Sequence, residues 1–161
     1  MNTATPDQRD WPLAMRRYLG ASIAGHLLWE TLQLPLYTLW TSGTFKQKAF
    51  AVFHCSLGDV MISGLTLLAA LALFARANWP RSGMGAVFAA SVSFGIIYTI
   101  YSEWLNVNVR GSWSYSDLMP VVPVIGTGLA PLIQWLIVPA LAMWFAIGRP
   151  PWRDDCPDED R

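Results

Sequence analysis

Four long apolar windows separated by short polar connections dominate this chain of 161 residues. The windows cover about residues 18–40, 49–75, 83–105 and 121–147. A helix of about 20 residues crosses a hydrocarbon core of about 30 Å, and each window reaches that length. A soluble bundle would need a polar stripe on every helix, and the run LTLLAALALFA in the second window has none. The pattern predicts an all-α, polytopic membrane protein built as a bundle of four transmembrane helices.

The segments outside these windows are polar and interrupted by proline. We expect residues 1–17 to form a flexible N-terminal arm and residues 148–161 a charged tail, on either side of a membrane domain at 18–147. The basic pair before the first window is similar to the start of a signal peptide. The apolar run that follows is too long for one and lacks an A-x-A cleavage site, so we interpret it as a retained first helix.

Composition and charge placement strengthen this interpretation. Only 14% of the residues are charged, against about 25% in an ordinary soluble domain. Eight basic residues flank one side of the predicted helices: Arg9, Arg16, Arg17, Arg76, Arg81, Arg149, Arg153 and Arg161. Three flank the other side: Lys46, Lys48 and Arg110. The positive-inside rule then predicts a multi-pass protein of the inner (plasma) membrane with both termini in the cytoplasm.

Several ionisable residues lie inside these apolar windows. They are His26, Glu30, His54, Asp59 and Glu103. A charged side chain near the bilayer centre costs roughly 2.5–3.5 kcal/mol on insertion scales, so such residues usually face the protein interior and mark function. At a rise of about 1.5 Å per residue, most of the five fall in the outer half of the membrane, with His26 and Gln134 near its middle. We expect one polar pocket that opens outward beneath the loop at 106–120.

Within this set, His26 and Glu30 are four residues apart and share one helix face. We predict catalytic roles for His26, Glu30, Asp59 and Glu103. We predict substrate contacts for six further residues: Trp135, Gln134, Tyr98, Tyr101, His54 and Trp113. Two of these residues also have structural interpretations, Glu103 as an interface anchor and His54 as a hydrogen-bonding residue between helices.

The predicted chemistry is acid–base catalysis on a hydrophobic isoprenoid- or sterol-like lipid, by an isomerase or a cyclase. A carboxyl group and a neighbouring histidine can protonate an alkene or remove a proton beside one. Carboxylates and aromatic faces can stabilise the cation that results. We expect no cofactor, and a membrane lipid or isoprenoid small molecule as the partner.

Two alternatives remain open from the residues alone. The chain can be a non-catalytic lipid-binding protein or an accessory membrane subunit, assembled with copies of itself or with a partner. It can also be a metal-dependent enzyme, since two histidines and three carboxylates are enough ligands for zinc or iron, although their spacing matches no known metal motif. Phosphate-binding glycine loops, nucleophile elbows and basic nucleic-acid patches are absent from the sequence, so no nucleic acid is expected.

The order of motifs resembles the emopamil-binding protein family, the four-helix EXPERA fold that includes sterol isomerases. The matching pieces are H-x-x-x-E at His26 and Glu30, the Gly58–Asp59 pair, a tyrosine-rich third helix that ends at Glu103, and W-x-x-x-P at Trp135. The resemblance implies that His26 and Glu30 shuttle a proton across a double bond while Trp135 supports the cation. The family's second glutamate on helix 2 is missing, and its helix-4 asparagine is replaced by Leu132.

A second set of motifs resembles the small membrane lycopene cyclases. It comprises E-x-x-N followed by GSWSY, then G-x-G-L-x-P, then IVP. The Pro-x-Glu-Glu motif of those enzymes is absent, because residues 131–135 read PLIQW. Both resemblances imply chemistry on an isoprenoid alkene.

Overall fold

Among the residues that the structure describes, all regular elements are helical. The computed structural model describes residues 10–76, 79–80 and 82–148. Its elements are α1 (Asp10–Gln33), η2 (Leu34–Leu36), α2 (Leu39–Ser42), α3 (Phe45–Phe74), α4 (Met84–Glu103), the π-helical η3 (Trp104–Val109) and α5 (Leu129–Ile147). Over the described residues the extended backbone is limited to two isolated bridges, Tyr37–Tyr115 and Val121–Gly128. The predicted all-α class is confirmed.

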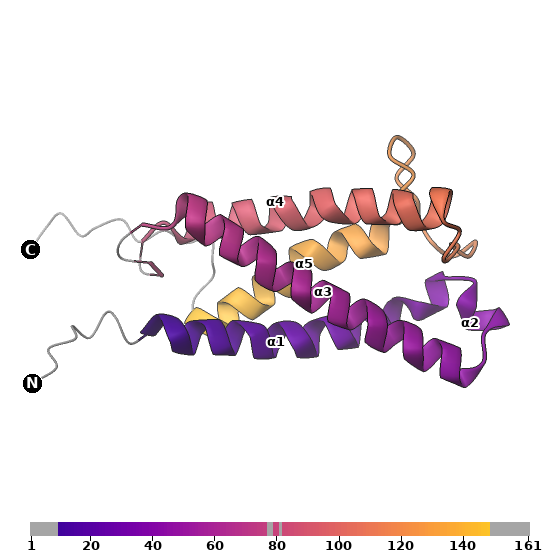
Figure 1. Cartoon of the computed structure of the whole chain (residues 1–161), viewed down its shortest axis with the longest axis horizontal. Coiled ribbons are helices and arrows are strands. Elements are labelled where there is room, and N and C mark those ends of the chain that lie inside the picture. The colour runs from indigo at the N-terminus through magenta and orange to yellow at the C-terminus, as the bar shows by residue number, and fades with distance from the viewer. Residues whose placement is uncertain (1–9, 77–78, 81, 149–161) are drawn as a thin grey trace, which may run out of the picture.

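Four long helices pack side by side as a bundle (Figure 1). α1 packs against α3 and α5, and α4 packs against the same two helices from the other side. The beginning of α1 and the end of α5 lie at one end of the bundle. The short helix α2, the π-helical turn η3 and the loop that follows it lie at the opposite end, which we call the loop end.

Three of these helices are long and apolar enough to cross a membrane: Phe45–Phe74, Met84–Val109 and Leu129–Ile147. Large apolar side chains cover the outside of the bundle, and many polar ones are buried inside it. A soluble bundle has the reverse arrangement, and exposed apolar surface on this scale marks a face that meets lipid or another protein. These three helices and the apolar outer surface indicate a membrane protein.

The first predicted span differs from the observed helix at both ends. α1 begins at Asp10, so the described part of the predicted flexible arm is helical, while residues 1–9 lie outside the described residues. α1 ends at Gln33 rather than near residue 40, and Pro35 falls in the 3-10 turn η2. Proline lacks a backbone N–H and restricts the residue before it, which explains why the helix ends there.

The fourth predicted span begins too early. Residues 121–128 form a tight loop and not a helix, and α5 starts only at Leu129. Val122 N donates to Thr127 O at 3.0 Å, and Gly126 has a φ of 68°, a left-handed conformation that glycine adopts at little cost. α5 ends at Ile147 with Gly148 as its C-cap, and the rest of the predicted charged tail lies outside the described residues.

The other two predicted spans lie close to the observed helices. α3 covers Phe45–Phe74 and begins at a capping box, in which Thr44 and Gln47 satisfy each other's backbone N–H groups. α4 covers Met84–Glu103 and continues into η3, so the predicted 106–120 loop starts as helical backbone.

The bundle interior has two parts. An apolar core lies toward the end where α1 begins: Tyr18, Leu67, Ala70, Met84, Val87, Ala142, Met143 and Ala146. Toward the loop end the interior becomes polar. At the boundary, α4 and α5 approach closely, because a Cβ at Gly95 would lie 2.1 Å from Trp135 Cε3. Because Gly95 has no side chain, there is room for the Trp135 indole in the interior.

Candidate functional site

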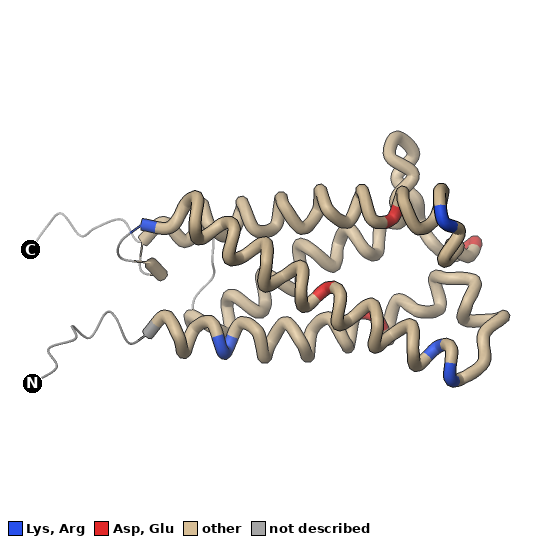
Figure 2. The backbone as a smooth tube through the Cα atoms, viewed as in Figure 1, with Lys and Arg blue, Asp and Glu red and all other residues tan. Residues whose placement is uncertain are grey.

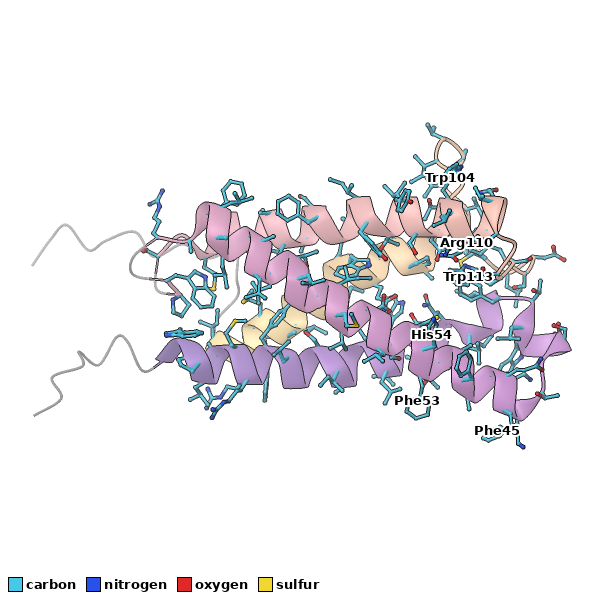
Figure 3. All side chains as sticks on the ribbon, viewed as in Figure 1. Phe45, Phe53, His54, Trp104, Arg110 and Trp113 are labelled. Atoms are coloured by element: carbon cyan, nitrogen blue, oxygen red, sulfur yellow. The ribbon has the colours of Figure 1, made fainter. Side chains whose placement is uncertain are left out.

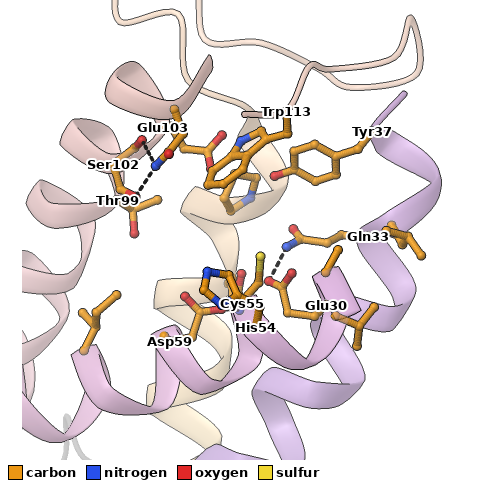
Figure 4. A pocket seen from close by; sticks show the side chains of 18 of the residues that line it. Glu30, Gln33, Tyr37, His54, Cys55, Asp59, Thr99, Ser102, Glu103 and Trp113 are labelled. Atoms are coloured by element: carbon orange, nitrogen blue, oxygen red, sulfur yellow. Dashed lines mark hydrogen bonds between the residues drawn. The ribbon is translucent and has the colours of Figure 1, made fainter. Parts of the chain in front are cut away.

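A cavity of about 320 Å³ lies among the helices at the loop end (Figure 4). Eight of the ten predicted site residues line it: Glu30, His54, Asp59, Tyr98, Glu103, Trp113, Gln134 and Trp135. The cavity therefore collects side chains from α1, α3, α4, α5 and the loop after η3. His26 and Tyr101 are not among its lining residues.

Two carboxyl groups meet in this cavity. The Glu30 side chain on α1 lies within hydrogen-bonding reach of the Asp59 side chain on α3. Glu30 Oε1 also accepts a hydrogen bond of 2.5 Å from Gln33 Nε2, one turn further along α1. Two carboxyl groups can hydrogen-bond to each other only when one of them carries a proton. The pair therefore offers an acid and a base at one place.

Gln134 connects this pair to His26. Its Nε2 donates one hydrogen bond of 2.9 Å to Asp59 Oδ2 and another of 2.9 Å to His26 Nδ1. His26 Nε2 lies 2.8 Å from Ser63 Oγ. Because Nδ1 accepts from an amide, the ring proton sits on Nε2 and is donated to Ser63. The geometry holds His26 as a neutral imidazole in one tautomer.

His26 lies behind the cavity wall. Its side chain is 0% exposed, and its ring is tilted by 52° against Trp135 at a centroid distance of 5.6 Å. Asp59 Oδ2 lies 3.8 Å from His26 Nδ1, with the Gln134 amide bonded to both. The sequence paired His26 with Glu30, but the structure pairs Glu30 with Asp59 and uses His26 to hold Gln134. In this arrangement His26 holds the Gln134 amide, and its predicted catalytic role stays a prediction.

The third carboxyl group, Glu103, ties the loop to α4. The Tyr115 hydroxyl donates to Glu103 Oε2, and Gly128 N donates to the same hydroxyl oxygen at 2.9 Å. Burial, followed by the hydrogen bond to Glu103, raises the pKa of Tyr115, so the phenol keeps the proton that it donates. Glu103 is 7% exposed, which places it inside the bundle and not in the interface position that its sequence also allowed.

The predicted loop over the cavity mouth is fastened on both sides. Opposite α4, its backbone pairs with the segment after α1: Thr38 N donates to Ser114 O at 3.0 Å, and Ser116 N donates to Leu36 O at 2.9 Å. These bonds place Trp113 in the cavity lining (Figure 4). His54, Arg110 and Trp113 all lie at this end of the bundle (Figure 3).

Two aromatic contacts settle the positions of the remaining predicted residues. His54 is exposed at the cavity edge and stacks on Phe50, with ring centroids 5.4 Å apart and an interplanar angle of 13°. Tyr101 is 55% exposed and its ring lies 6.2 Å from that of Trp104. Tyr101 thus lies on the outside of the bundle and does not line this cavity. α4 turns Tyr98 toward the cavity instead.

Sequence reasoning missed several residues of the site. Gln33 and Ser63 had a usable signal, because Gln33 follows Glu30 by three positions and Ser63 follows Asp59 by four, so each shares its neighbour's helix face. Tyr37, Cys55 and Arg110 also line the cavity. Cys55 precedes Asp59 by four positions on α3, so it had the same signal. Nothing in the sequence marked Tyr37 and Arg110, since their positions depend on how the segments after α1 and after α4 fold over the mouth.

A metal-dependent enzyme would need a cluster of metal ligands. Over the part of the chain that is described, no group of three or more His, Cys, Asp or Glu side chains is placed to hold a metal ion. His26 has both ring nitrogens engaged, by Gln134 and Ser63. His54 lies at the cavity edge, and its ring stacks on Phe50.

Comparison with known protein families, curated proteins and solved structures finds no match to this chain. The resemblances to EXPERA proteins and lycopene cyclases therefore stay expectations drawn from short motifs. The cavity and its hydrogen bonds carry the functional argument that follows.

Proposed function

We propose that α1 is a fourth membrane span. Its 24 residues measure about 36 Å as a helix, which exceeds the hydrocarbon core of about 30 Å. Ile23, Leu28 and Leu32 are exposed on its outer face. The polar residues that lower its average hydropathy, such as His26 and Glu30, are buried against the other helices. A helix can face lipid on one side and a polar interior on the other.

The proposed orientation in the inner membrane places the start of α1 and the end of α5 in the cytoplasm. The eight basic residues that flank this side along the sequence support it, against three on the loop side. Figure 2 shows basic residues near both ends of the bundle, and acidic residues both between them and at the loop end. The cavity would then open toward the outer face of the membrane.

We propose that this protein is an acid–base isomerase or cyclase of a hydrophobic isoprenoid- or sterol-like lipid. The observation that carries the proposal is the contact between the Glu30 and Asp59 carboxyl groups in the wall of the cavity. Two carboxyl groups this close in a medium of low dielectric do not both ionise, so the pair holds one proton. Such a pair can give a proton and take one back without a cofactor.

The proposed reaction needs no proton donor or acceptor besides the carboxyl groups of Glu30 and Asp59. The protonated carboxyl transfers its proton to one carbon of an alkene and leaves a carbocation at the other carbon. The ionised carboxyl then removes a proton from a neighbouring carbon, and a double bond forms there. In a cyclisation, a second alkene attacks the cation before that proton is lost. Either way the pair ends with one proton, as it began.

The surroundings suit a transient cation. The Trp135 indole and the Glu103 carboxylate both line the cavity, and each can stabilise positive charge. A volume of about 320 Å³ is at the small end of the range for ligand pockets. We therefore propose that the cavity takes a ring or the end of a lipid chain, with the rest of the molecule in the membrane.

Deuterium transfer tests this proposal directly. The full chain in lipid vesicles in D₂O would be incubated with a Δ8 sterol and, separately, with lycopene, and each lipid would be analysed by mass spectrometry. We expect deuterium on carbon in at least one lipid class, a loss of at least 100-fold in rate for Glu30→Gln or Asp59→Asn, and normal transfer for Tyr101→Phe. Equal transfer by wild type and Glu30→Gln would overturn the acid–base assignment.

A binding function is the second candidate, and one observation favours it. A continuous chain of polar side chains runs through Gln33, Glu30, Asp59, Gln134, His26 and Ser63, as it would in a purely structural network. Every link is a direct hydrogen bond except the contact between the Glu30 and Asp59 carboxyl groups. In that case the chain is a lipid-binding protein or an accessory subunit beside a second copy or a partner. Lipid retained equally by wild type and Glu30→Gln, without deuterium transfer by either, would indicate this function.

A further inference from the structure

α3 and α4 border the cavity on the side of the bundle, away from the loop. The two helices pack together toward the end where α1 begins, where Thr66 Oγ1 lies 3.3 Å from Ser91 Oγ, and they diverge toward the loop end (Figure 1). The cavity lies between them where they diverge, with Asp59 of α3 and Thr99 of α4 both in its wall (Figure 4).

Two lining residues show that the cavity is open on this side. Tyr98 of α4 lines the cavity and is also 46% exposed, so its ring lies at the edge between the cavity and the surroundings of the bundle. Gly58 of α3 lines the cavity as well, and among the described residues no atom lies within 4 Å of the position that its Cβ would take. At Gly95, by contrast, Trp135 fills that position. We call the gap that Gly58 and Tyr98 border the side opening.

The side opening lies near the middle of two membrane spans. α3 and α4 both belong to helices that are long and apolar enough to cross a membrane. At a rise of about 1.5 Å per residue, Gly58 lies about 20 Å from Phe45 and about 24 Å from Phe74 along α3. Tyr98 lies about 21 Å from Met84 along α4. The side opening is therefore at the depth of the lipid acyl chains, inside a hydrocarbon core of about 30 Å.

The surface next to the side opening is apolar. Leu57 and Met61 on α3 are exposed, and so is Ile97 on α4. The mouth at the loop end differs, because it carries the exposed guanidinium of Arg110. A hydrocarbon chain can therefore pass from the bilayer to the cavity across apolar surface at the side, whereas the mouth would bring it past polar groups and water.

We propose that the hydrocarbon chain of a membrane lipid enters the cavity from the bilayer through the side opening. Gly58 gives the side opening its width, since a larger side chain there would occupy the gap, and the Tyr98 ring borders the chain on the α4 side. The chain then reaches the carboxyl groups of Asp59 and Glu30 in the cavity wall. The inference rests on the proposed binding of lipid in this cavity, and it holds whether or not the lipid is chemically changed there.

Photocross-linking from the bilayer tests this route. The full chain would be placed in phosphatidylcholine vesicles that contain a phospholipid with a diazirine at the end of one acyl chain, and mass spectrometry would locate the adducts. We expect adducts on Glu30, because its side chain is buried from the outer surface of α1 and lines the cavity. Adducts on Leu28, which is exposed on the same helix, report the lipid around the bundle and serve as the reference. Adducts on Leu28 with none on Glu30 would overturn the proposal.

Substitution of Gly58 decides whether the chain uses the side opening. Gly58→Leu should lower the ratio of Glu30 to Leu28 adducts about tenfold, because the new side chain fills the gap, and Gly58→Ala should lower it less. Neither change should lower the apparent Tm, since the space at this Cβ position is empty and both residues favour helix over glycine. Should Gly58→Leu not fold, the smaller change to alanine decides by the direction of the same ratio.

Gly20→Leu is the matched control. Gly20 is a glycine of α1 that does not line the cavity, and within the described part of the chain nothing lies within 4 Å of its Cβ position. This variant should keep the wild-type ratio of adducts. A wild-type ratio in Gly58→Leu as well would show that the chain enters elsewhere and would overturn the side opening.

The side opening and the proposed catalysis can fail separately. Cross-linking of Glu30 that depends on Gly58, without deuterium transfer to any lipid, would support the side opening and leave the cavity with a binding function. Deuterium transfer at the wild-type rate in Gly58→Leu would overturn the side opening and leave the acid–base assignment in place.

Discussion

Gln134 on α5 donates to Asp59 Oδ2 on α3 over a distance of 2.9 Å, although the two residues are far apart in the sequence. The same amide nitrogen donates to His26 Nδ1, also at 2.9 Å. Gln134 is 1% exposed, so its amide lies in the interior of the bundle. This amide joins three helices and decides which side of the His26 ring is protonated.

Replacing Gln134 should therefore destabilise the bundle. Gln134→Met has a similar size but no donor, and leaves Asp59 and His26 each without one partner. We expect a loss of about 1–3 kcal/mol in the free energy of unfolding, measured by chemical denaturation in micelles. Leu136→Met on the same helix is the control, because Leu136 is exposed and should tolerate the change. Equal stability of the two variants would mean that the Gln134 bonds contribute nothing.

The His26 tautomer can be observed without any substitution at the site. With ¹⁵N-labelled histidine, NMR should show a neutral imidazole protonated at Nε2. The chain has two histidines, so His54→Gln assigns the signals. A signal from His26 protonated at Nδ1, or at both nitrogens, at neutral pH would show that the Gln134 amide is oriented the other way.

The contact between Gly95 and Trp135 predicts a strong steric effect. Gly95→Ala places a methyl group about 2 Å from the indole, closer than real Cβ contacts allow, so α4 or Trp135 must shift. Overpacking of this kind typically costs about 1–3 kcal/mol. Gly20→Ala is the matched control, because nothing lies within 4 Å of its Cβ position and alanine favours helix. Thermal unfolding of both variants checks the prediction, and a Gly95→Ala variant as stable as wild type would contradict this packing.

Tyr115→Phe should release the loop over the cavity. The hydroxyl joins Glu103 to Gly128 N, so its loss frees one side of the loop and leaves the backbone pairing with residues 36–38 in place. We expect faster hydrogen exchange at Gly128, with little change in the middle of α3. Tyr98→Phe serves as the comparison, because Tyr98 lies on the cavity wall outside the loop. Unchanged exchange at Gly128 in Tyr115→Phe would show that the loop is held by other contacts.

The hydrophobic pattern predicted which segments are helical better than it predicted where the helices begin and end. The helices Phe45–Phe74 and Met84–Glu103 were predicted at 49–75 and 83–105, within four residues at each end, because long apolar stretches leave few alternatives to a helix. The ends near Pro35 and Gly126 were wrong, because apolar residues there continue the pattern after the helix has stopped. A window average does not register that a single proline or glycine ends a helix.

For the site, the presence of ionisable residues inside apolar windows identified Glu30, Asp59 and Glu103. Membrane helices carry such residues only at a cost in insertion free energy. Helical spacing also placed His26 and Glu30 on one face. This reasoning could not predict which of these side chains contact each other. His26 and Glu30 both face α3, where Asp59 lies between them and takes the contact that the sequence gave to the His26–Glu30 pair.

The amino-acid sequence by itself determined that this protein is helical, that it presents apolar surface to its surroundings and that it buries a few polar residues. Those properties follow from local composition and from the helical period. Only the tertiary structure decided that Glu30 meets Asp59, that Gln134 and Ser63 hold His26, and that Tyr115 fastens a loop to Glu103. These contacts join residues on different helices, so they depend on how the helices pack and rotate against each other, which the pattern along one chain does not specify.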